Sequence, residues 1–498
     1  MFSTSCPQCG APVEFRSAAS VTAVCASCRS MLLKQGETVE RTGTMATVFE
    51  DYSRLQIGAT GHDRQRTFTV LGRIQLTYDA GYWSEWYIAF DDGNFGWLSD
   101  ASGQFAITTR VDSTAPLPAF GSVYPGYTLD FDGQRYVLSD TRTAHCSGGE
   151  GELPFRIGDG WTARVADFRR LDRFITLDWS EVQDDDPASR PVVYLGQSVE
   201  LDALGCVGLR ETEAIRETAG QYRGELKAFS CPSCGAPLAA PAGVAEYVVC
   251  GSCHAGVDCT REQAVVFAVE QKMATVSTAL APGASATFDG RPYTVLGVMR
   301  CRTSTHSATW DEYLLHNIER GLMWLVQSEG SWERVDVLNA WPDITSEQRV
   351  VFEGKPFLEK GRYDAVVTYV AGAFNWRVSV GDTTSITDFM YRTHKLTRET
   401  TQHEIVWSRA RPVPNIRMAE RFGDPKLAGS NEASSATSRR GFFPLPWIAS
   451  AILVVVNFGD LAGSLPSVLL LLLGIAALWI PEWIWLATVH HEPEDDDA

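Results

Sequence analysis

The chain has 498 residues, which at about 150 residues per domain predicts roughly three domains. Apolar residues make up 45% and charged residues 21%, which is ordinary globular usage and excludes a wholly disordered or fibrous chain. The net charge of −18 disfavours nucleic acid as a partner, because a strongly negative surface repels phosphate backbones.

The first predicted element is a zinc ribbon at residues 1–40. It carries two C-x-x-C pairs, Cys6 with Cys9 and Cys25 with Cys28, separated by 15 residues. A two-residue gap lets both thiolates of a pair reach one ion, and 15 residues suffice for a hairpin that brings the second pair across. Because four thiolates fill a tetrahedral site, we expect structural zinc, with iron in a rubredoxin-like site as the alternative. The first residues show neither a basic nor an apolar signal region, so we expect no secretory signal.

A β domain is predicted next, at residues 45–205. Residues 86–90 and 95–98 read as two strands joined by a turn at 91–94, since Gly at such a turn supplies a positive φ. Residues 363–370 and 375–380 are likewise predicted to form two strands. Long helical periodicity is missing between residues 45 and 410. The prediction is therefore a mainly β protein of compact antiparallel barrels or sandwiches.

The sequence then repeats itself. Cys231, Cys234, Cys250 and Cys253 follow the first four cysteines at an offset of 225, and 68–72 recurs as 293–297 at the same offset. These matches predict a tandem duplication, with a second ribbon at 226–262 and a second β domain at 272–415. A weaker likeness among 131–136, 288–293 and 352–357 indicates that each β domain is itself two related halves.

The duplicated Trp-x-Glu pairs are the candidate ligand-binding residues of the β domains. Residues i and i+2 of a strand share a face, so Trp83 with Glu85, and Trp310 with Glu312, could flank a ligand. A Trp core anchor with a satisfied carboxylate is the favoured alternative. Asp91 and Asp92 at the predicted turn complete the candidate set, which contains no catalytic residue. The single cysteines Cys146, Cys206, Cys259 and Cys301 are expected to be inert thiols.

The C-terminal part breaks from the rest in composition. Residues 423–440 are rich in Ser, Ala, Asn and Gly and predict a flexible linker. Two apolar runs within 442–489 predict a pair of transmembrane helices, since a bilayer core needs about 20 apolar residues in a helix. The acidic tail spans 490–498. Because Arg439 and Arg440 precede the first run, the positive-inside rule puts both termini and the bulk of the chain in the cytoplasm, at the inner membrane.

The residues following the first ribbon resemble a known family. Residues 83–87, 90–93, 96–98 and 103–105 are similar to the bacterial domain-of-unknown-function family 4178 (DUF 4178). The resemblance covers roughly residues 45–200 and, more weakly, 275–415. In the second range, residues 317–320 stand in place of the acidic hairpin turn of the first copy. The family has no established activity, so the resemblance implies no catalytic residues. It carries a weak association with membrane-associated and polyamine-related gene sets.

Together these features predict a membrane-anchored binding or scaffold protein with two structural zinc sites. Its partners are expected to be the membrane and other proteins. An enzyme acting on a small cationic ligand such as a polyamine, through Glu85, Asp91 and Asp92, is the alternative. A zinc-ribbon nucleic-acid binder is a third reading, but neither ribbon offers a basic face with interleaved aromatic residues.

Overall fold

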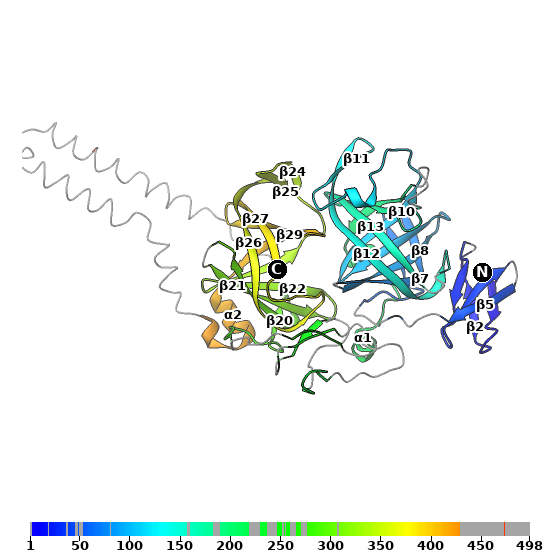
Figure 1. Ribbon diagram of the computed structural model, residues 1–498, viewed down its shortest axis with the longest axis horizontal. Coiled ribbons are helices and arrows are strands. Elements are labelled where there is room, and N and C mark those ends of the chain that lie inside the picture. Colours follow the sequence, from blue (N-terminus) through cyan, green and yellow to red (C-terminus); the bar gives the residue numbers. More distant parts are fainter. Residues whose placement is uncertain are drawn as a thin grey trace, which may run out of the picture. The chain divides into compact units, whose positions relative to one another are not determined.

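The computed structural model describes most of the chain up to residue 428. The described residues are 2–17, 19–35, 38–44, 48, 53–79, 81–156, 160–182, 190–218, 230–236, 247–250, 253, 255–258, 265–269, 276–305, 308–428 and 473. The chain divides into two compact units, Met1–Asp424 and Pro425–Ala498. The first unit contains the two β-barrels that carry the candidate sites, drawn in cyan and in green to yellow in Figure 1.

Barrel 1 is a closed ring of eight antiparallel strands, with two further short strands, at residues 60–63 and 128–131, paired outside the ring. Its first half contains β6 (Thr60–Asp63), β7 (Arg66–Tyr78), β8 (Gly81–Phe90), β9 (Phe95–Ala101) and β10 (Gln104–Val111). Its second half contains β11 (Thr128–Phe131), β12 (Gln134–Leu153), β13 (Trp161–Arg170), β14 (Arg173–Asp178) and β15 (Val192–Val199). Each half is a meander, and the halves join where β10 pairs with β15 and β7 pairs with β12. The expected barrel or sandwich is therefore a barrel.

Barrel 2 repeats this plan. Its first half contains β19 (Ser285–Phe288), β20 (Arg291–Thr303), β21 (Thr309–Asn317), β22 (Gly321–Ser328) and β23 (Ser331–Val337). Its second half contains β24 (Asp343–Ser346), β25 (Arg349–Phe352), β26 (Lys355–Phe374), β27 (Thr383–Tyr391), β28 (His394–Thr400) and β29 (Ile405–Val413). Pairing of β23 with β29 and of β20 with β26 closes the ring.

The hairpins that start the halves form because of their turn residues. Asp132 and Gly133 both have positive φ, at 48° and 70°, and Asp289 and Gly290 repeat this with 51° and 72°. Two successive positive φ values define a type I′ turn, whose twist matches that of the paired strands. The predicted turn at 91–94 is also confirmed, because β8 ends at Phe90 and β9 begins at Phe95.

The strand expected at 375–380 is wrong. β26 continues to Phe374, and the next strand, β27, begins only at Thr383. The apolar alternation here comes from a turn that packs against the core. Val378 is 4% exposed, and the Trp376 ring lies 5.4 Å from that of Trp324.

Glycines let the two halves of each barrel approach closely where β7 meets β12 and where β20 meets β26. A Cβ atom on Gly72 of β7 would lie 2.0 Å from the carbonyl oxygen of Glu152 on β12. Gly297 of β20 repeats this close approach, with the carbonyl oxygen of Ala373 on β26 at 2.6 Å. The repeated motif that ends at Gly72 and at Gly297 therefore marks the barrel seam, where no larger residue fits.

The segment with the first four cysteines continues the sheet of barrel 1. The strands that extend the sheet are β3 (Thr22–Val24), β4 (Ser30–Gln35) and β5 (Thr38–Thr44), whereas β1 (Phe2–Ser5) and β2 (Pro12–Phe15) form a separate two-stranded sheet. β3 pairs with the far end of β12, where the buried Glu152 carboxylate accepts hydrogen bonds from the amides of Arg16 and Ser17 at 2.7 and 3.0 Å. Ser20 Oγ also donates to Glu152, at 2.6 Å.

The second cysteine segment is joined to the sheet of barrel 2 in the same way. It contains β16 (Tyr247–Val249), β17 (Ala255–Asp258) and β18 (Val265–Val269), and β16 pairs with the far end of β26. Both 20-residue strands, β12 and β26, are thus shared between a barrel and a cysteine segment.

The described helices are short. They are the helices α1 (Thr212–Thr218) and α2 (Asn415–Phe422) and the 3-10 helices η1 (Phe120–Ser122), η2 (Leu201–Leu204) and η3 (Pro425–Ala428). η3 lies in the predicted linker, so the first residues of 423–440 are structured. Within the described ranges, no helix is both long and apolar enough to cross a bilayer. The spans expected within 442–489 lie outside the described residues, Leu473 excepted, and so does the acidic tail.

Candidate metal centres and barrel interiors

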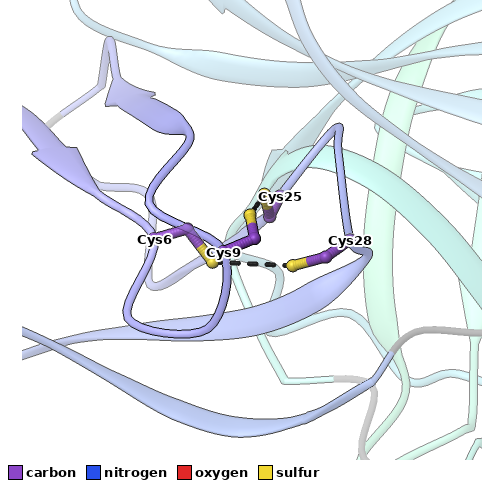
Figure 2. A group of neighbouring side chains, drawn as sticks. All are labelled: Cys6, Cys9, Cys25 and Cys28. Carbon is purple, nitrogen blue, oxygen red and sulfur yellow. Dashed lines mark hydrogen bonds between the residues drawn. The ribbon is translucent and has the colours of Figure 1, made fainter.

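The first four cysteines converge on one point. Cys6 Sγ lies 3.6 Å from Cys28 Sγ, and Cys9 Sγ lies 3.6 Å from Cys25 Sγ. All four sulfurs lie within 4.8 Å of one another. Figure 2 shows the four cysteine side chains pointing toward one another. Four thiolates at about 2.3 Å from one tetrahedral ion would be about 3.8 Å apart, so the cluster could bind a metal ion.

Backbone hydrogen bonds hold each cysteine pair in a tight turn. The amide of Gly10 donates to the carbonyl of Cys6 at 2.8 Å, and the amide of Arg29 donates to the carbonyl of Cys25 at 2.8 Å. Gly10 and Arg29 both have positive φ, at 76° and 59°. The two turns therefore have the same form, although only one has the glycine that this conformation favours.

The second cluster has the same geometry. Cys231 Sγ lies 3.5 Å from Cys253 Sγ, and Cys234 Sγ lies 3.7 Å from Cys250 Sγ. In each cluster the first and third cysteines are buried, the second is exposed and the fourth is half-buried. The eight cysteines thus form two matching tetracysteine clusters. His254, beside the second cluster, lies outside the described residues.

The Trp-x-Glu pairs lie on the interior faces of the barrels. In barrel 1, Trp83 Nε1 donates to Glu85 at 2.9 Å, and Ser99 Oγ of β9 donates to its other oxygen at 2.7 Å. In barrel 2, Trp310 Nε1 donates to Glu312 at 2.6 Å. All four of these Trp and Glu residues line a cavity with a volume of about 740 Å³. The carboxylates are hydrogen-bonded, as a core anchor requires, but they also face open space.

The strands of these two interiors fall in the ranges that a family model matches. The model, described as a domain of unknown function (DUF4178), matches residues 56–201 and 281–415. The chain belongs to the DUF4178 family. It contains two tandem copies of the domain, and no curated protein matches it.

Three interior carboxylates recur in the two DUF4178 copies. Besides Glu85 and Glu312, Asp167 of β13 corresponds to Asp388 of β27, since Thr176 donates to Asp167 at 2.7 Å and Thr397 donates to Asp388 at 2.8 Å. The third pair is Asp178 of β14 and Glu399 of β28. Both later pairs have an offset of 221.

Burial changes how these carboxyls ionise. It raises the pKa of Glu85 to about 7, with a smaller rise from the charges of Asp167 and Asp178, while the hydrogen bonds from Ser99 and Trp83 oppose the rise. Burial likewise raises the pKa of Asp167 and of Asp178. A group with a pKa near 7 exchanges protons under neutral conditions.

Sequence reasoning missed most of this interior. Asp167 and Asp388 are related by the repeat at an offset of 221, but no property of either residue in the sequence marks it as cavity-lining. Asp178 and Glu399 were missed altogether, although both lie two residues beyond the interior Thr of their strand. The signal that could have found them is a carboxylate at the same interior position of both copies, where alternation expects an apolar or neutral residue.

Asp91 and Asp92 do not line the cavity. Both are exposed in the turn between β8 and β9, where Asp92 accepts a hydrogen bond from the amide of Asn94 at 2.9 Å. Six residues of extended strand separate Glu85 from Asp91, which corresponds to about 20 Å. The expected grouping of these carboxylates at one site is therefore corrected.

Two of the single cysteines are packed as expected of inert thiols. Cys146 and Cys301 are 0% and 3% exposed, and burial raises the pKa of Cys146 to about 12. Cys206 is half-buried, and burial raises its pKa to about 11. Cys259 lies outside the described residues.

Proposed function

We propose that this DUF4178 protein is a membrane-anchored binding or scaffold protein in which each tetracysteine cluster holds one structural zinc ion. The observation that carries the metal part of the proposal is the sulfur spacing of 3.5–3.7 Å between facing cysteines in both clusters. That spacing is close to the edge of a zinc tetrathiolate tetrahedron, about 3.8 Å. Zinc is proposed rather than iron because closed four-cysteine sites with two-residue gaps within each pair are the usual structural zinc sites.

A structural role follows from the size of the cysteine segments. A segment of about 40 residues is too short to bury an adequate core, so metal binding would supply much of its folding free energy. Because β3 and β16 continue the sheets of the barrels, the metal would also support the far ends of β12 and β26.

Elemental analysis of the purified chain tests the metal assignment. We expect two zinc ions per chain, falling to about one in Cys25→Ser. Cys206→Ser, which changes a half-buried thiol outside both clusters, is the matched control and should keep two. One metal ion in the wild type, iron as the dominant element, or an unchanged count in Cys25→Ser would each contradict the proposal.

The membrane anchor is proposed from the two apolar runs within 442–489. A helical hairpin there would leave the barrels and the acidic tail on the cytoplasmic side, where a reducing environment suits thiolate ligands. The proposed partners are the membrane and other proteins. Nucleic acid fits poorly with the net charge of −18.

The enzyme alternative loses part of its basis. It relied on Glu85 acting together with Asp91 and Asp92, and those two aspartates lie on an exposed turn. A binding role is therefore preferred. Measured turnover of a small cationic substrate that disappears in Glu85→Gln would overturn that preference.

A further inference from the structure

The two barrel interiors differ in the charge that balances their carboxylates. In barrel 1, Arg142 Nε lies 3.1 Å from Asp140 Oδ1, and the nearby charge of Arg169 favours ionised Asp167. Tyr363 of β26 is the counterpart of Arg142 of β12. Arg142 pairs with Val165 and Tyr363 pairs with Ile386, and both residues of the second pair are offset by 221 from those of the first.

The same offset places Met390 at the position of Arg169. Both interior arginines of barrel 1 are thus replaced by uncharged residues in barrel 2.

Glu399 lines the cavity without a partner of opposite charge among the described residues. Among the described residues it makes no hydrogen bond and no ion pair through its side chain, although it lines the cavity. The charges around it are those of Glu312, Asp388 and Glu404, all of the same sign. Burial and these neighbours raise the pKa of Glu399 to about 8.

The other charged groups of this interior are already paired. Asp388 accepts hydrogen bonds from Thr397 at 2.8 Å and from the Tyr363 hydroxyl at 3.2 Å. Lys395, the cation that projects from the same strand as Glu399, forms an ion pair with Glu333. Arg142 pairs with Glu404 at 2.6 Å. Lys395 also acts weakly on Glu312, which leaves Glu399 as the enclosed carboxylate with no cation of its own.

Aromatic side chains line the same cavity as this carboxylate. Trp310, Trp324 and Tyr363 line the same cavity, and the Trp310 and Tyr363 rings meet edge to face at 6.0 Å. Aromatic faces attract organic cations through their quadrupole, and a carboxylate adds a charge-assisted hydrogen bond to an N–H donor. Carboxylate and aromatic walls together favour an ammonium group that carries an apolar chain over a bare metal ion.

We propose that the interior of barrel 2 binds a small organic ammonium ion, which pairs with Glu399 and supplies the positive charge that barrel 1 takes from its own arginines. The site refines the binding role proposed above. It does not depend on the identity of the metal in the cysteine clusters.

Calorimetric titration of the purified full chain at pH 8.5 tests this inference, with n-butylammonium as the probe. We expect saturable binding of one equivalent per chain. n-Butanol, which has the same chain without the charge, should not bind, and equimolar sodium or calcium chloride should not displace the probe. Equal binding of n-butanol, full displacement by the inorganic cations, or no saturation at millimolar concentrations would overturn the proposal.

Two variants locate the site. Glu399→Gln should weaken binding about tenfold or more, because it removes the charge but keeps the shape. Asp178→Asn, the counterpart in barrel 1, is the matched control and should bind as the wild type does. Tyr363→Arg restores the arginine found in barrel 1 and should abolish binding.

Wild-type affinity in both Glu399→Gln and Tyr363→Arg would refute the assignment. The metal content of each sample, measured in parallel, separates a failure of this inference from a failure of the zinc proposal. The comparison of n-butylammonium with n-butanol on the wild type stands even where a variant does not fold.

Discussion

Replacing Glu85 by Gln should make barrel 1 more stable above neutral pH. The wild-type carboxyl has a pKa of about 7 in the fold against an ordinary value of 4.5. Between these two values the folded chain holds a proton that the unfolded chain has lost, so stability falls as pH rises through this window and is level above it. Gln cannot ionise, and its amide can keep partners in Trp83 and Ser99.

The size of the effect follows from the pKa difference. A difference of about 2.5 units corresponds to about 3 kcal/mol at most. Water in the cavity screens part of this, so we expect Glu85→Gln to exceed the wild type by about 1–3 kcal/mol at pH 8. At pH 5, where the wild-type carboxyl is largely protonated in the fold, the two proteins should differ by less.

Hydrogen exchange of the full chain in urea, followed by mass spectrometry, measures this difference locally. The readout is the opening free energy of peptides from β8 and β9 at pH 5 and pH 8, after correction for intrinsic exchange rates. Glu211→Gln, a substitution at an exposed site, is the control and should leave both values unchanged. The reasoning fails if Glu85→Gln loses as much stability with rising pH as the wild type, or is the less stable protein at both pH values.

Two further predictions concern the seam and the membrane. Gly72→Ala should lower the stability of barrel 1 by about 3 kcal/mol or more, because its Cβ would lie 2.0 Å from a backbone oxygen, whereas Gly361→Ala, with nothing within 4 Å, should have little effect in thermal unfolding. A reporter fused after Ala498 should be active only in the cytoplasm if residues 442–489 cross the membrane twice, and activity only outside would contradict that topology.

The cysteine clusters and hairpin turns could be predicted because their chemistry is local. Two-residue gaps bring Cys6 and Cys9 to one point whatever surrounds them, and the turn at Asp132 and Gly133 depends only on its own two residues. Barrel closure could not be predicted in this way. It depends on residues 80 positions apart, such as Gly72 and Glu152, which approach because both strands curve.

The interior carboxylates were hidden by the ambiguity of strand alternation. β8 alternates Glu85 with Trp86, and alternation alone assigns them to opposite faces without saying which one faces the cavity. The usual rule places the larger apolar residue inside. Here Trp86 instead packs with Leu55 and Leu201, which lie before and after the barrel strands, and Glu85 lines the interior.

The division of each barrel into halves creates a problem of partner choice during folding. Four similar half-barrels lie in one chain, and each exposes two unpaired strand edges until it finds its complement. A half of one copy could therefore close on a half of the other, which is the domain swapping to which repeat proteins are prone. The seams differ, since β12 meets β7 over Gly148–Gly151 whereas β26 meets β20 over Ala365–Gly372. Equivalent residues pair in both seams, since Gly151 meets Gly72 and Gly372 meets Gly297, so the copies differ in the length of the seam and not in its register. A swapped pair of halves would lose part of the longer seam between β26 and β20, which favours the correct pairing.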